Sequence, residues 1–65
     1  RYKDAIDALE RSLALKPDNA FARAKLGSAY LAMGNKDKAQ EQYQLLKTLN
    51  AAMAEDLHRE MEGKK

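Results

Sequence analysis

The chain has 65 residues, of which 45% are hydrophobic and 34% charged, and a formal net charge of +2. This length allows one small domain, and the absence of cysteine excludes disulfides as a source of its stability. Acidic and basic residues are interspersed without a block of one sign, which argues against a nucleic-acid-binding arm. No apolar run approaches the ~18 residues of a membrane-spanning helix, so we expect no membrane insertion.

The first helix is predicted over residues 2–15. Its apolar positions recur at the spacing of one helix face. Pro17 ends this helix, because proline disfavours the helical conformation of the residue before it. Asp18 is then expected to cap the next helix by accepting hydrogen bonds from its free N–H groups. The apolar stripe consists of Ala5, Ile6, Leu9, Ser12 and Leu13.

The second helix is predicted over residues 19–33, and it is apolar or small on nearly every side. A helix of this kind expects neighbours on more than one face. Gly34 stops it, since glycine readily adopts the positive φ that ends many helices. Asn35 is expected to cap the helix that follows. Gly27 lies in the helix interior, where glycine costs stability and therefore needs a packing reason.

Two further helices are predicted, over residues 36–49 and 51–61, and Asn50 is expected to cap the second. No segment shows the strict alternation of a half-buried strand, so the expected fold is all-α with about four helices. Residues 63–65 are expected to form a frayed polar tail. The apolar stripes consist of Ala39, Tyr43, Leu46 and Leu49 in one helix and of Met53, Ala54, Leu57 and Met61 in the other.

A repeating pattern runs through these helices. The segment Arg23-x-x-Leu26-Gly27-x-x-Tyr30 is followed by Gly34 and by Ala39-x-x-x-Tyr43. An offset of 34 residues also relates Ala5 to Ala39, Leu9 to Tyr43, Leu15 to Leu49 and Ala20 to Ala54. This pattern resembles the tetratricopeptide repeat, a unit of about 34 residues that reads W-x₂-L-G-x₂-Y, A-x₃-F and P. The residues that carry the resemblance are Pro17, Leu26, Gly27, Tyr30, Gly34, Ala39 and Tyr43.

The resemblance implies an α-solenoid fragment of stacked antiparallel helix pairs. Residues 1–16 would be the second helix of a preceding repeat, residues 17–50 one full repeat, and residues 51–62 a C-terminal capping helix. In this fold Gly27 and Ala39 are small so that neighbouring helices can approach closely. Arg23 stands where the family prefers Trp, and we expect its stem to cover the core edge while the guanidinium reaches water.

In the proteins that this chain resembles, the first helix of each repeat lines a groove that holds a peptide or a partner helix. The resemblance therefore implies a protein–protein interaction module, a scaffold or adaptor rather than an enzyme. Family members that hold a C-terminal carboxylate use Lys and Asn where this chain has Ala24 and Ser28, so an apolar anchor is expected instead. The alternative for Phe21 is that it simply packs on an adjacent helix. The expected groove residues are Phe21, Ala24, Ser28, Leu31, Ala32 and His58.

The apolar stripe of the helix predicted over residues 2–15 suggests a second hypothesis, which is self-association. In that stripe, Ile6, Leu9 and Leu13 would normally rest on the first helix of their own repeat, which this sequence does not contain. Some apolar surface should therefore stay exposed and invite a partner. We expect the sequence to derive from a longer chain, and expect the isolated segment to form a homodimer, including by exchange of helices. The alternative function is thus a purely structural end-cap or self-association segment of a longer solenoid.

Catalysis and metal binding have weak support. Ser12 and Ser28 have no plausible His and Asp partners, and there is no cysteine nucleophile or glycine-rich phosphate loop, so we expect no enzyme and no cofactor. Glu55 and His58 have the i, i+3 spacing of a carboxylate–histidine metal pair. One isolated pair is better interpreted as a solvated helix face, so no metal site is predicted.

Two other surfaces have weaker support than the groove. The methionines, Met33, Met53 and Met61, can suggest a plastic binding surface, but at helical spacing they are better interpreted as core fillers. A nucleic-acid interface would use Arg23, Lys25, Lys36 and Lys38, yet no aromatic residues are interleaved with these for base stacking. A protein or peptide partner is therefore favoured over nucleic acid. The cellular compartment is not indicated.

Overall fold

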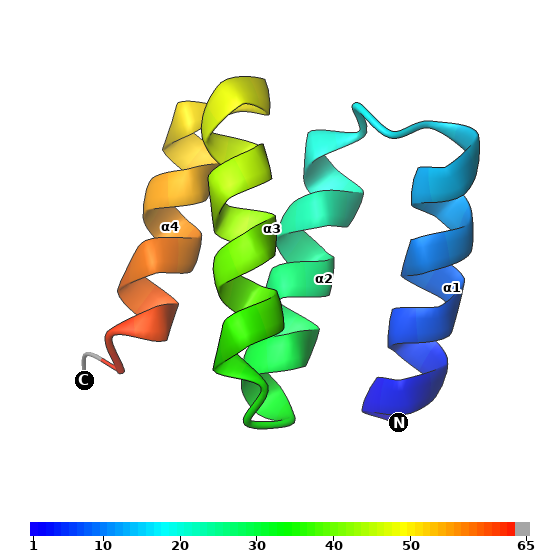
Figure 1. Cartoon of the computed structure of the whole chain (residues 1–65), viewed down its shortest axis with the longest axis horizontal. Coiled ribbons are helices and arrows are strands. Elements are labelled where there is room, and N and C mark those ends of the chain that lie inside the picture. Colours follow the sequence, from blue (N-terminus) through cyan, green and yellow to red (C-terminus); the bar gives the residue numbers. More distant parts are fainter. Residues whose placement is uncertain (64–65) are drawn as a thin grey trace.

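A computed structural model describes residues 1–63 as four helices without a strand: α1 (Tyr2–Leu15), α2 (Ala20–Ala32), α3 (Lys36–Leu49) and α4 (Ala51–Met61) (Figure 1). The predicted all-α fold is confirmed, and three of the four predicted ranges coincide with the helices. The second helix is one residue shorter than predicted at each end. The frayed tail expected over residues 63–65 lies, beyond Gly63, outside the described residues.

Asparagine side chains begin three of the helices. The Oδ1 atoms of Asn19, Asn35 and Asn50 accept hydrogen bonds from the backbone N–H three residues later, at 3.1, 3.2 and 3.0 Å. These bonds satisfy N–H groups that have no partner inside the helix. The predicted caps at Asn35 and Asn50 are confirmed. The prediction of Asp18 was wrong, because α2 begins at Ala20 and the capping position directly before it belongs to Asn19.

Gly34 turns the chain between α2 and α3. Its φ is +82°, which is the left-handed region that glycine enters without the steric cost of a Cβ atom. The chain reverses direction at each connection, so the four helices are antiparallel neighbours in sequence order (Figure 1). The predicted stack of antiparallel helix pairs is therefore confirmed.

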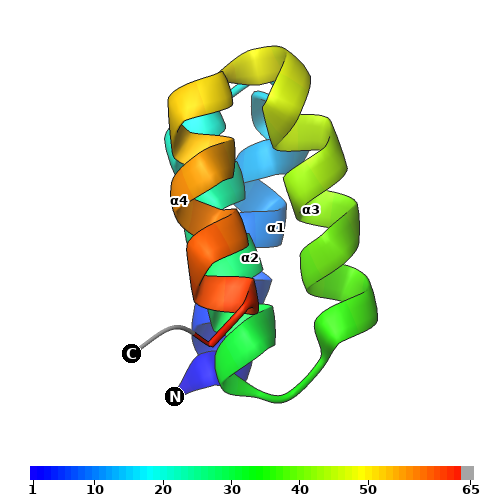
Figure 2. The same ribbon diagram turned by 90° about the vertical axis from the view of Figure 1, so that its left-hand side faces the viewer.

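α2 holds the arrangement together, because it packs on α1, α3 and α4. α3 and α4 also pack on each other, whereas α1 packs on α2. The Cα trace measures 33 × 27 × 16 Å, so the helices form a thin slab. Figure 2 shows the slab from the side of α4, with α3 and α4 in front and α1 behind.

Two hydrophobic clusters form the core. One cluster joins α1, α2 and α3, and the other joins α3 and α4. Leu31 packs against both clusters, so it links them. The first cluster contains Leu13, Ala22, Leu26, Tyr30 and Ala39, and the second contains Leu46, Ala54 and Leu57.

The predicted core positions require three corrections, of which the first is that Ala5 in the α1 stripe is exposed. Leu49 is 37% exposed, and the buried face of α3 continues instead through Gln42. Met33 is 51% exposed, so it is not a core filler, because it lies in the turn after α2. Met53 and Met61 do pack partly buried against the second cluster, as predicted.

The interior glycine has the packing reason that was expected. A Cβ atom placed on Gly27 would lie 2.6 Å from Leu57 Cδ2 and 3.4 Å from Gln42 Cβ. Both distances place a neighbouring helix directly against the Gly27 backbone, and the tighter contact comes from α4. Ala39 is fully buried against α2 and completes this close approach on α3.

Candidate functional site

A small pocket lies between α2 and α4, and we call it the α2–α4 groove. It has a volume of about 130 Å³. On each helix the lining residues are spaced three or four positions apart, which places them on one face. They are Phe21, Ala24 and Ser28 from α2 and Met53, Asp56, Leu57 and Glu60 from α4.

The groove combines an exposed aromatic ring with two carboxylates. Phe21 is 60% exposed at the rim, and Lys25 Nζ lies 5.2 Å from the centre of its ring. The hydroxyl of Ser28 donates a hydrogen bond of 2.7 Å to Glu60 Oε1, which ties α2 to α4 across the groove. Asp56 lies 3.0 Å from Arg59 on the exposed side of α4.

The structure brings together three of the six expected groove residues. Phe21, Ala24 and Ser28 line the same pocket. Leu31 is half-buried between the two core clusters and does not line this pocket. Ala32 does not line this pocket but a different one, between α1 and α2, which shares Ser28 with it.

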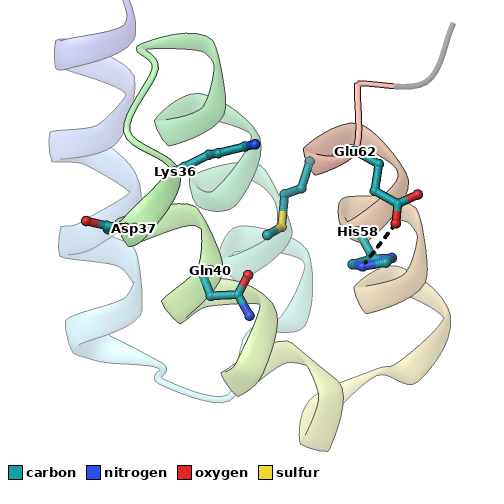
Figure 3. Close-up of a pocket in the computed structure, with 6 residues that line it drawn as sticks. Lys36, Asp37, Gln40, His58 and Glu62 are labelled. Atoms are coloured by element: carbon teal, nitrogen blue, oxygen red, sulfur yellow. Dashed lines mark ion pairs between the residues drawn. The ribbon is translucent and has the colours of Figure 1, made fainter.

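His58 lies in a third pocket, between α3 and α4, which we call the α3–α4 pocket (Figure 3). Its ring stacks on Tyr43 with the ring centres 5.2 Å apart, and its Nε2 lies 3.5 Å from a carboxylate oxygen of Glu62. The offset of 34 residues explains this position. Ala24 on α2 faces the next repeat unit, which is α4. His58 is the equivalent residue 34 positions later, so on α4 it points in the same direction along the stack and therefore away from α2.

The α3–α4 pocket is mixed in character, with charged and amide side chains beside Met61. Its volume is about 410 Å³, and its walls are formed mainly by charged and amide side chains. Figure 3 shows Lys36 and Gln40 of α3 on the side of the pocket opposite His58 of α4 and Glu62, the residue that follows α4, while the carboxylate of Asp37 points away from them.

A further groove lies between α1 and α2, and we call it the α1–α2 groove. It has a volume of about 380 Å³, and it is mostly apolar. Three residues were predicted for self-association. Leu9 lines this groove and is half-buried, and Ile6 is half-buried but does not line it. Leu13 is buried in the core. The lining residues are Tyr2, Ala5, Leu9, Lys25, Ser28, Ala29 and Ala32.

Arg23 does not send its guanidinium into water as expected. Its Nη1 donates a hydrogen bond of 3.2 Å to Gln42 Oε1, and its Nη2 donates one of 2.9 Å to the Pro17 carbonyl. The Nε atom is buried and has no hydrogen-bond partner among the described residues. Arg23 therefore joins the turn before α2 to α3, because both acceptors lie within reach of its planar fork.

Tyr30 makes a polar link across the first cluster. Its hydroxyl donates a hydrogen bond of 2.6 Å to Glu10 Oε2 on α1. This bond, together with burial and the nearby negative charges of Glu10 and Glu41, raises the pKa of Tyr30 to about 12. The deprotonated tyrosine would lose the bond and face a carboxylate, so the neutral form is favoured.

Sequence reasoning missed the α4 wall of the α2–α4 groove. Met53, Asp56, Leu57 and Glu60 follow i, i+3, i+4, i+7 spacing, which is the signal of one helix face. The signal is present in the sequence, but it does not say which neighbour that face meets.

Two further properties of the described residues concern metal binding and membrane insertion. Residues 1–63 contain no cluster of three or more His, Cys, Asp or Glu side chains that could hold a metal ion. Within the same part of the chain, no helix is both long enough and apolar enough to cross a membrane.

Residues 1–59 match the model of a family described as tetratricopeptide repeat. No curated protein and no solved structure matches the chain.

Proposed function

Because this chain belongs to the tetratricopeptide repeat family, we propose that it binds a peptide or a helix of a partner protein in the α2–α4 groove. The family indicates a protein–protein interaction module, typically without catalytic activity. The observation that carries the proposal is the position of Phe21. This large apolar side chain is 60% exposed beside a pocket, where it costs solubility and supplies an anchor.

The size of the groove supports a peptide rather than a small molecule. Pockets for small molecules measure roughly 300–1,000 Å³ and enclose most of the ligand. The α2–α4 groove, at about 130 Å³, suits one side chain of a longer ligand that continues over the surface.

The proposed division of the chain follows the family's repeat. Residues 1–16, with α1, would be the second helix of a preceding repeat, and residues 17–50, with α2 and α3, one full repeat. Residues 51–62, with α4, would be a capping helix. The charged and amide side chains of the α3–α4 pocket support the last assignment, because a capping helix needs polar groups on its outer side.

The test is the selection of binders from a phage-displayed library of random peptides on the immobilised chain. The variant Phe21→Glu places a charge at the anchor and should abolish enrichment. The matched control is Leu45→Glu, because Leu45 is also exposed, at 48%, but lies on α3 outside the groove. Circular dichroism shows whether both variants keep the helicity of the parent chain. Equal enrichment by the parent chain and Phe21→Glu would contradict the proposal.

A second candidate function is self-association or end-capping through the α1–α2 groove. Ala5 and Ala39 are related by the 34-residue offset, yet Ala39 is fully buried and Ala5 is exposed. The difference arises because α2 covers Ala39, whereas no helix of the described chain occupies the equivalent position over Ala5. This exposed site supports a second copy as occupant in the isolated chain.

Sedimentation over a range of concentrations tests this candidate. The variant Ala5→Glu puts a charge in the α1–α2 groove and should shift a dimer to the monomer mass. The control is Ala8→Glu, because Ala8 is also exposed on α1 but does not line the groove. A dimer that survives Ala5→Glu would place the interface elsewhere, and a monomer at all concentrations would remove this candidate.

A further inference from the structure

The α2–α4 groove carries negative charge on one wall. Its lining includes the carboxylates of Asp56 and Glu60 and no Lys or Arg side chain. Resting on the proposed function, we infer that the peptide bound there presents an arginine or lysine beside an apolar residue. The apolar residue packs against Phe21, and the cation reaches the carboxylates of α4.

Glu60 is the central acceptor of this arrangement. Its Oε1 accepts the hydrogen bond from Ser28, which holds the carboxylate at the groove. No Lys, Arg or His nitrogen of residues 1–63 forms an ion pair with it. An ionised carboxylate offers about four acceptor positions over its two oxygens, so Glu60 can accept a further donor beside Ser28. A guanidinium or ammonium is the donor that makes the strongest hydrogen bonds with it.

Asp56 adds a second, weaker charge. It pairs with Arg59 at 3.0 Å, but both side chains are largely exposed, so this pair contributes little stability. A cation from a peptide can share or replace Arg59 at small cost. Lys25 is the other neighbouring cation, and it lies over the Phe21 ring and lines the α1–α2 groove rather than the α2–α4 groove.

The shape of the groove fits a long cationic side chain. Lysine and arginine have apolar stems that lie along hydrophobic surface while the charged head stays near water or a carboxylate. Met53 and Leu57 supply that surface in the floor of the groove, and Glu60 lies one helical turn further along α4. A volume of about 130 Å³ holds one such side chain.

The experiment pans the phage-displayed random library on the parent chain, on Phe21→Glu as the groove control, and on three charge variants. Glu60→Gln removes the charge but keeps an acceptor for Ser28, and Asp56→Asn removes the second charge. Glu55→Gln is the matched control, because Glu55 is an exposed carboxylate of the same helix that does not line the groove. Synthetic copies of the enriched peptides are then titrated against each protein.

We expect the parent chain to enrich peptides with Arg or Lys next to an apolar residue. Their affinity should fall about three- to tenfold in Glu60→Gln, less in Asp56→Asn, and not in Glu55→Gln. The affinity for the parent chain should also fall as salt is raised, because exposed charges are screened.

The outcomes separate the two proposals. Peptides enriched without a basic residue, or bound equally by Glu60→Gln, would overturn this inference and leave the groove as a peptide site. An absence of enrichment beyond that of Phe21→Glu would overturn the proposed function, and this inference with it.

Discussion

The hydroxyl of Tyr30 on α2 lies 2.6 Å from Glu10 Oε2 on α1, so a buried phenol is tied to an exposed carboxylate of the neighbouring helix. The bond has a role beyond its own energy. Among the described helices, α2 is the one that packs along α1, and apolar contacts have no directional preference along the helix axis. A hydrogen bond of defined length therefore helps to fix the register of α1 on α2.

Removing this bond should destabilise the fold without creating a cavity. Tyr30→Phe keeps the ring and deletes the hydroxyl, and we expect the free energy of unfolding to fall by about 1–2 kcal/mol. Urea denaturation measures the loss. The matched control is Tyr43→Phe, because the Tyr43 ring stacks on His58 while its hydroxyl makes no hydrogen bond to the described residues. Equal losses in the two variants would contradict a specific role for the Tyr30 bond.

The same pair predicts a loss of stability at alkaline pH. The pKa of Tyr30 is raised from 10.0 to about 12 in the folded chain, so the folded state keeps the proton after the unfolded state has lost it. The stabilisation is complete below pH 10 and is lost as pH rises from 10 to about 12. We expect a loss of about 1–2 kcal/mol over this range relative to Tyr30→Phe. Urea denaturation of both proteins at each pH cancels the titration of the lysines, and parallel curves would contradict the prediction.

The effect of Gly27→Ala on the free energy of unfolding should depend on the side chain at position 57. Alanine favours a helix over glycine by about 1 kcal/mol, but its Cβ would lie 2.6 Å from Leu57 Cδ2. Leu57 is buried and can move little, so we expect a net destabilisation of about 1–2 kcal/mol in the parent chain. In Leu57→Val, which lacks both Cδ atoms, the same substitution should be neutral or stabilising. Thermal unfolding of the four proteins in this double-mutant cycle measures the coupling, and additive effects would argue against the close contact.

The cap of α2 can be assigned by two neighbouring substitutions. Asn19→Ala deletes the side-chain acceptor for the Ala22 N–H and should cost about 1 kcal/mol. Asp18→Ala should change the stability by less than about 0.5 kcal/mol, because Asp18 is exposed and makes no capping bond. Thermal unfolding followed by circular dichroism compares them. A larger loss of stability from Asp18→Ala than from Asn19→Ala would mean that Asp18, the residue predicted from the sequence, caps α2.

Local rules were sufficient to predict the helices. Proline, glycine and asparagine mark the connections, and each acts on the backbone within a few residues, so α1, α3 and α4 were predicted to the residue. The cap of α2 was misassigned because Asp18 and Asn19 are both good capping residues. Only the position where the helix begins separates them.

The groove was predictable on one helix and not on the other. Phe21, Ala24 and Ser28 lie together because helical spacing places them on one face. His58 was expected across from them by continuation of the repeat, but equivalent positions in successive repeats, here on α2 and α4, point in the same direction along the stack and not at each other. The path of the Arg23 side chain depends on Gln42 and the Pro17 carbonyl, which spacing does not bring together.

The charged residues of the α3–α4 pocket and the mostly apolar α1–α2 groove make the two ends of the helix stack unlike. A filament grows by heterologous contacts, in which one end of each copy binds the opposite end of the next. Charged and amide groups such as Lys36, Asp37 and Gln40 are poorly matched to the mostly apolar α1–α2 groove of another copy. Association through that groove would therefore pair two like ends about a two-fold axis, and a symmetric dimer of this kind consumes both apolar surfaces and stops growing.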